Sequence, residues 1–263
     1  MKGIFKRHQG DLPQMTEESG TLLNSGLDDF YNWRLNEALS KFEQVSKLDS
    51  KSAAAHTHAG TTYLKLKRPD LALQEFEAAT RIEPENGEIY ARMAVALWRK
   101  GDHTASRQAF EQASRLSASS WVHHLALAEL AIMQNNYEEA LGNYRLAEDD
   151  LPGDPRVLIG MGVLLLKMQR NADACDVLRR AVDSGLSDPE LWYSLGVGEF
   201  RLSHYSQAYE ALQKAVILDP NYTKAMAPLA RLDFQKGRWI HALKHFMTAI
   251  RLEIAQEQQM KNQ

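Results

Sequence analysis

Apolar residues recur along the chain at intervals of three and four, in stretches of about a dozen residues separated by short polar segments. One such stretch, NNYEEALGNYRLAEDDLPGD, occupies residues 135–154 and carries Ala140, Tyr144 and Ala147 before Pro152. Residues three and four apart share one face of a helix, and proline cannot continue a helix. The stretch therefore predicts an amphipathic helix that ends at the proline.

The same pattern returns every 34 residues. Small residues stand at Ala38, Ala72, Ser106, Ala140, Ala174, Ala208 and Ala242. Four residues later come Phe42, Phe76, Phe110, Tyr144, Leu178, Leu212 and Phe246, and three further Val45, Ala79, Ala113, Ala147, Ala181, Ala215 and Ala249. Twelve residues before the first series lie Gly26, Gly60, Ala94, Ala128, Gly162, Gly196 and Ala230. The register predicts seven units: 19–52, 53–86, 87–120, 121–154, 155–188, 189–222 and 223–256.

Each unit predicts two short helices joined by a polar turn. Small residues at the shared positions let two helix backbones approach closely, and the large apolar residue fills the space between neighbours. Pro84, Pro152 and Pro220 are expected to end the second helix of alternate units. Helices of this length are marginal alone, so each pair must bury its face on the next pair. The result is an all-α stack, with residues 1–18 as a tail or cap and residues 257–263 extending the last helix.

The repeat resembles the tetratricopeptide repeat in period and in signature residues. The sixth unit carries the signature in Trp192, Leu195, Gly196, Ala208, Leu212, Ala215 and Pro220. The resemblance covers residues 19–256. It implies a right-handed superhelical solenoid in which the first helices line a concave groove and the second helices lie outside.

The resemblance also implies a partner-binding stripe, because positions 2, 5, 6, 9 and 13 of each unit face the concave side in this family. In units four to six these positions include Leu125, Ile159, Val163, Tyr193 and Val197. Such a stripe suits an apolar or amphipathic partner segment. The alternative is that these side chains only pack first helix against first helix, as apolar helix stripes commonly do.

The sequence predicts no catalytic residue, metal site or cofactor, and hence no enzyme. His241 and His245 share a helix face, but no glutamate base and no third ligand accompany them. Cys175 is expected to be a buried, inert thiol. Gly160 and Gly162 lie in a predicted helix and form no phosphate loop.

Charge and composition bear on the cellular compartment of the chain and on its self-association. It has 263 residues, one cysteine and a formal net charge of −3. No signal peptide or membrane span is evident, and a reducing compartment fits, so a cytoplasmic protein is predicted. The fourth unit is acidic and the seventh basic, which permits self-association through the terminal repeats, although solvated faces would look the same.

These observations predict a non-enzymatic scaffold or adaptor that binds a protein or peptide segment in its groove. The alternative is a chaperone-like carrier that shields an apolar segment of a secretion or assembly client. A third class, a helical-repeat RNA binder, conflicts with the fixed 34-residue period, the net negative charge and the apolar groove.

Overall fold

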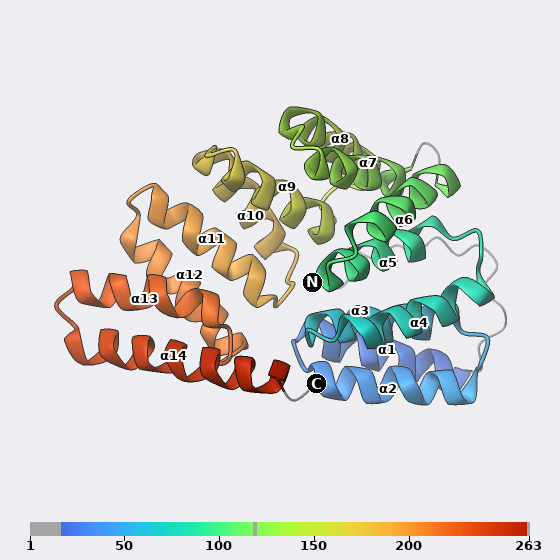
Figure 1. Cartoon of the computed structure of the whole chain (residues 1–263), viewed down its shortest axis with the longest axis horizontal. Coiled ribbons are helices and arrows are strands. Elements are labelled where there is room, and N and C mark those ends of the chain that lie inside the picture. The colour runs from blue at the N-terminus through green and yellow to red at the C-terminus, as the bar shows by residue number, and fades with distance from the viewer. Residues whose placement is uncertain (1–16, 118–119, 262–263) are drawn as a thin grey trace. The chain divides into compact units, whose positions relative to one another are not determined.

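The computed structural model describes residues 17–117 and 120–261, and only the backbone of residues 253 and 255–261. All regular secondary structure in these ranges is α-helical (Figure 1). The predicted tail at residues 1–18 lies, up to residue 16, outside the described residues. The all-α helical repeat predicted from the sequence is confirmed.

The described residues form fourteen helices, arranged along the chain as successive pairs. The first helices of the pairs are α1 (Glu17–Tyr31), α3 (Ala53–Lys65), α5 (Gly87–Lys100), α7 (Trp121–Met133), α9 (Pro155–Lys167), α11 (Pro189–Arg201) and α13 (Thr223–Gln235). The second helices are α2 (Leu35–Leu48), α4 (Pro69–Ile82), α6 (His103–Leu116), α8 (Tyr137–Asp150), α10 (Asn171–Asp183), α12 (Tyr205–Leu218) and α14 (Trp239–Lys261).

The chain divides into two compact units. Met1–Phe30 and Arg34–Ala109 form the first, and Tyr31–Trp33 and Phe110–Gln263 form the second. In the first unit α2 packs on α3, α3 on α4 and α4 on α5, and α3 also contacts α5. In the second unit each helix from α7 to α13 packs on the next one, and α11 contacts both α9 and α13. The first helices α9, α11 and α13 therefore form a continuous layer within that unit.

Local sequence signals set the helix ends. Side-chain oxygens of Ser52, Asn86, Asp154 and Asp188 accept hydrogen bonds from backbone N–H groups at the starts of α3, α5, α9 and α11. Such caps satisfy donors that have no partner inside the helix. The helices α4, α8 and α12 end two residues before Pro84, Pro152 and Pro220, as the sequence predicted.

The turn within each helix pair contains one residue in the left-handed region. The residues are Trp33, Lys67, Gly101, Asn135, Gln169, Ser203 and Gly237, with φ between 59° and 92°. The residue after it donates its backbone N–H to a carbonyl five positions earlier, as Asn136 does to Ala131 at 2.9 Å. The turn therefore repeats with the same 34-residue period as the core.

The core confirms the predicted pairing of small and large residues. Phe42, Phe76, Tyr144 and their counterparts up to Leu212 are at most 2% exposed. A Cβ atom added to Gly60 would lie 2.7 Å from Cε1 of Phe76, too close for any side chain. Phe246, in the seventh unit, is the exception, since 54% of it is exposed.

Two exposed glycines, one inside a helix and one in the left-handed turn conformation, test the assigned backbone geometry. Gly142 lies inside α8 and Gly101 has φ +92°, and no atom lies within 4 Å of a Cβ added to either. Gly142→Ala should stabilise the fold by about 0.5–1 kcal/mol, because alanine loses less backbone freedom on folding. Gly101→Ala should destabilise it by about 1–2 kcal/mol, because alanine is strained in the left-handed region. Thermal melts that shift in the same direction for both variants would contradict the assigned turn.

Candidate functional site

Three first helices of the second unit carry the predicted stripe. Leu125 lies on α7, Ile159 and Val163 lie one turn apart on α9, and Tyr193 and Val197 lie one turn apart on α11. Residues four apart share a helix face, so each pair on α9 and α11 presents a common surface. Direct contact between α9 and α11 brings these two pairs into one layer.

The stripe lies at the boundary between core and surface. Val163 is 42% exposed, and the other four side chains are half-buried. Leu125 and Ile159 pack against the core cluster that runs from α7 to α12, whereas Tyr193 packs against the cluster of α12 and α13. The inner parts of these side chains thus support the fold while their outer parts stay accessible to a partner.

A carboxylate beside the stripe joins α7 to α8, at a point where α9 packs closely against α8. Glu129 stands one turn after Leu125 on α7, and its Oε1 accepts a hydrogen bond of 2.6 Å from the Tyr144 hydroxyl. Tyr144 reaches this position because Gly160 on α9 has no side chain. A Cβ atom there would lie 2.5 Å from the Tyr144 hydroxyl oxygen. The absence of a side chain at Gly160 therefore makes room for the Glu129–Tyr144 contact.

Burial determines the electrostatics of this contact. Removal from water raises the pKa of the Glu129 carboxyl, and the hydrogen bond from Tyr144 opposes that rise. Burial and the adjacent carboxylate raise the pKa of the Tyr144 hydroxyl well above its ordinary value. Among the described residues, Glu129 has this phenol as its partner and no cation.

A second polar group lies beside Tyr193. The rings of Tyr193 and Tyr222 have centroids 5.6 Å apart. The Tyr222 side chain is buried, and its hydroxyl has no hydrogen-bond partner among the residues that the structure describes. Burial and the carboxylates of Glu190 and Asp188 raise the pKa of this hydroxyl, so it remains a hydrogen-bond donor.

Some of these additional residues stand out in the repeat pattern. Glu129 is the one acid in its column of the repeat, and Tyr144 is the one member of its column with a hydroxyl. Gly160 is the one glycine in its column of the repeat. Tyr222 lies in the segment between α12 and α13, where helical periodicity gives no information.

The cysteine and the two histidines that the sequence singled out are not arranged for catalysis or metal binding in the described residues. Cys175 is buried as predicted, and burial raises the pKa of its thiol to about 11, which keeps it protonated. His245 Nδ1 lies 3.0 Å from Oδ2 of Asp233 on α13, whereas His241 is exposed. Within the described residues, no three His, Cys, Asp or Glu side chains gather as a metal site.

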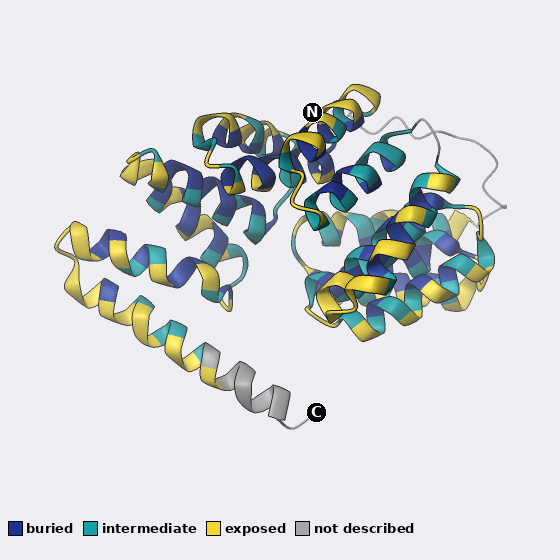
Figure 2. Ribbon diagram, turned by 45° about the horizontal axis from the view of Figure 1, so that its top comes forward, coloured by how far each residue is buried: buried dark blue, intermediate teal, exposed yellow. Residues whose placement is uncertain are grey.

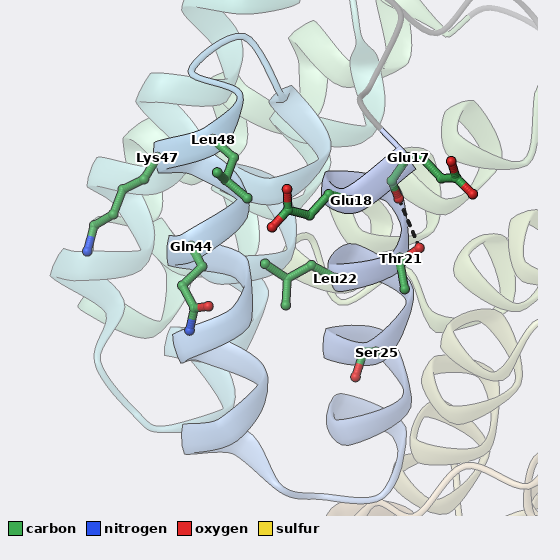
Figure 3. Close-up of a pocket in the computed structure, with 8 residues that line it drawn as sticks. All are labelled: Glu17, Glu18, Thr21, Leu22, Ser25, Gln44, Lys47 and Leu48. Atoms are coloured by element: carbon green, nitrogen blue, oxygen red, sulfur yellow. Dashed lines mark hydrogen bonds between the residues drawn. The ribbon is translucent and has the colours of Figure 1, made fainter.

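The first unit contains an open hollow of about 980 Å³ beside α1 and α2 (Figure 3). Its lining is Glu17, Glu18, Thr21, Leu22, Ser25, Gln44, Lys47 and Leu48. The Thr21 hydroxyl donates a 2.9 Å hydrogen bond to the Glu17 carbonyl, within α1 itself. Six of the eight lining residues have polar side chains, and the lining contains no pair of converging reactive groups, so the hollow is an open surface of the first helix pair.

Comparison with known families decides the classification. A model of the tetratricopeptide repeat matches residues 92–155 and 159–223, and a second model of the same repeat matches residues 33–96. The chain belongs to the tetratricopeptide repeat family. Membership supports a general role as a scaffold for protein interactions.

Individual relatives are distant. Human protein O-mannosyl-transferase TMTC3 is 23% identical over 225 residues, which cover 79% of this chain and 25% of that protein. The peroxisomal targeting signal receptor of Kluyveromyces lactis is 22% identical over 223 residues, which cover 82% of this chain and 39% of the receptor. The chain thus spans about a quarter to two fifths of these curated relatives.

A solved structure confirms the fold. In the crystal structure of the APC/C hetero-tetramer Cut9–Hcn1, one chain superimposes with a TM-score of 0.64 at 18% identity. The match covers 89% of this chain and 45% of the other. The two chains therefore share the helical-repeat architecture. At 18% identity the match shows the fold and not the function. None of the helices in the described residues is long and apolar enough to cross a membrane.

Glu129→Gln tests the electrostatics of the Glu129–Tyr144 pair. Glutamine can still accept the Tyr144 hydrogen bond but has no charge to desolvate, so the variant should melt higher at about pH 7. The folded-state pKa of Glu129 is raised, so its ionised form costs stability above that pKa. This cost disappears below the ordinary value of 4.5, and the gain should vanish there.

Tyr144→Phe is the matched control, because it leaves the buried carboxylate without a partner. It should lower the free energy of unfolding by about 1–3 kcal/mol. A Glu129→Gln variant that melts lower than the native protein at neutral pH would contradict the assigned burial.

Proposed function

We propose that the chain is a non-enzymatic scaffold or adaptor that binds a protein segment along α7, α9 and α11. Leu125, Ile159, Val163, Tyr193 and Val197 form the apolar part of the site. The observation that carries the proposal is their partial exposure beside Glu129, a carboxylate that is bonded to the Tyr144 hydroxyl but has no cation among the described residues. Apolar surfaces with a few oriented polar groups are typical of binding sites.

The carboxylate specifies the chemistry of the partner. Glu129 is a partly buried carboxylate without a cation among the described residues, so a lysine or arginine of the partner would supply the missing charge. The expected partner is therefore an apolar or amphipathic segment that carries a basic residue.

The relatives favour a protein partner. The Kluyveromyces lactis protein is named a receptor for a targeting signal, and Cut9 was crystallised in a hetero-tetramer with Hcn1. We infer a partner of the same general class here, without its identity. A cytoplasmic location belongs to the proposal, since the protonated, buried Cys175 needs no oxidising compartment.

A chaperone-like carrier is the second candidate, and the apolar character of the stripe favours it. A carrier would keep one client soluble, whereas an adaptor would hold a partner that is soluble by itself. Aggregation of the isolated partner, measured with and without the chain, separates the two functions. RNA binding is disfavoured by the acidic Glu129 at the site.

The experiment is selection of peptides from a random display library by the full chain, followed by affinity measurements on the enriched peptides. Enriched peptides should combine apolar residues with a lysine or arginine. Tyr193→Ala should weaken their binding by about 2 kcal/mol, roughly 30-fold, because a large aromatic anchor is lost. Val163→Glu should weaken binding without unfolding, since that side chain is already exposed.

Ile217→Glu is the matched control, because Ile217 is 67% exposed and lies on α12, away from the stripe. It should bind like the native chain. Glu129→Gln should lose the preference for basic peptides while its stability rises, a combination that damage to the fold cannot produce. Full binding by folded Val163→Glu would move the site elsewhere, and loss of helical circular dichroism in Ile159→Glu would assign Ile159 to the core.

A further inference from the structure

The last helix, α14, carries a broad apolar stripe on its outer face. Its members are between 36% and 82% exposed: Trp239, Ile240, Leu243, Phe246, Met247, Ile250 and Ile254. At about 100° per residue, all seven fall within roughly 120° of the helix surface. The helix packs on α13 through its opposite side, where Ala242 is buried and His245 is bonded to Asp233. Figure 2 shows the exposed residues along this helix, which leads to the C-terminal end.

The stripe is wider than stacking of helix pairs requires. Phe246 occupies the position of Phe76 and Tyr144, which the next helix pair buries. Ile240 and Met247 occupy positions that remain exposed in the other six second helices. The counterparts of Ile240 are Asn36, Asp70, Thr104, Glu138, Ala172 and Ser206, and those of Met247 are Glu43, Glu77, Glu111, Arg145, Arg179 and Gln213. A further helix pair on the stack would leave Ile240 and Met247 in water.

The spacing of the stripe fits a partner helix. Trp239, Leu243, Phe246 and Ile250 follow one another at intervals of four, three and four residues. This is the heptad pattern of a helix that faces another helix. Ile240, Met247 and Ile254 recur every seven residues along one flank, which adds the third apolar position typical of helices in a bundle core.

The size of the stripe fits a stable dimer. Seven large side chains with these exposures leave roughly 800 Å² uncovered. That exceeds the few hundred Å² common on monomers and equals the ~800 Å² that each partner buries in an interface of standard size. A two-fold contact needs one self-complementary surface, and an apolar helix stripe meets that condition.

The opposite end of the chain does not complement α14. The outer face of α1 presents Thr21, Ser25 and Asp28. At the position of Ser25 the later first helices have Ala59, Met93, Leu127, Met161, Leu195 and Leu229. Among the described residues, this side of the first helix pair offers the apolar stripe only Leu22 and Leu48 to pack on. The head-to-tail contact that the uneven charge permits is therefore disfavoured.

We propose that α14 forms the two-fold contact of a homodimer, in which the stripe of one copy packs on the stripe of another. The proposal does not rest on the peptide site, because α14 carries none of its residues. Lys244 and Arg251 border the stripe and bring like charges to the rim of the dimer. Salt screens such charges, so dimerisation should strengthen as salt is added.

Sedimentation equilibrium of the full chain over a dilution series tests the proposal. The native protein should reach twice 29.8 kDa and stop there. Phe246→Glu and Leu243→Glu should each weaken the dimer by at least about 100-fold, because a charge would be buried without a partner. Both variants should keep their helical circular dichroism, since these side chains are exposed in the single chain.

Ile217→Glu again serves as the control for adding a charge to an exposed apolar residue, and it should dimerise like the native chain. Three results would overturn the proposal: a native monomer at high concentration, growth beyond two copies, or a folded Phe246→Glu variant that still dimerises. Flotation with vesicles of phosphatidylcholine and phosphatidylglycerol tests whether the stripe binds a lipid surface and not a second copy. A monomer that binds these vesicles less tightly as salt is added would assign the stripe to a lipid surface instead.

Discussion

The close contact between a small residue on the first helix of a pair and a large apolar residue on the second sets the geometry of this chain. At Gly60 and Gly196 the backbone itself is the surface against which Phe76 and Leu212 pack. Any larger residue would push the two helices apart, and the next pair would lose its place in the stack. Because every helix has only 13 to 23 residues, such shared burial contributes more to stability than any single helix can.

The places where this contact departs from its usual form coincide with the two proposed binding surfaces. Tyr144 adds a hydroxyl to an otherwise apolar column, and the hydroxyl passes Gly160 to reach Glu129. Phe246 retains the aromatic ring but is exposed, and Met247 beside it replaces the polar residues of the other units. A departure from a repeat that is otherwise consistent is therefore informative about function.

The sequence predicted the helices, the buried columns and the proline stops, because all three follow from local spacing. It did not predict the left-handed residue in every turn, since at five of the seven positions that residue is not glycine. Lys67 and Gln169 adopt this conformation because packing of the flanking helices imposes it. The sequence also did not predict that Val163 is more exposed than Ile159, because both residues are apolar and lie one turn apart on the same helix. Only the neighbouring helices determine which of them is covered.

The buried acids of the chain show how a structural carboxylate differs from one available for recognition. Asp29 bonds to Arg34 and Lys41, which lower its pKa, and Glu199 lies 2.8 Å from His204 and 2.5 Å from Arg179. In both cases an arginine or lysine of the chain itself, Arg34 and Lys41 for Asp29 and Arg179 for Glu199, supplies the positive charge that offsets desolvation. Glu129 receives only a phenol hydroxyl among the described residues, so its charge remains uncompensated and its pKa is raised. A group that costs stability in the free chain can contribute strongly to affinity, because a cation from the partner then compensates a desolvation that folding has already imposed.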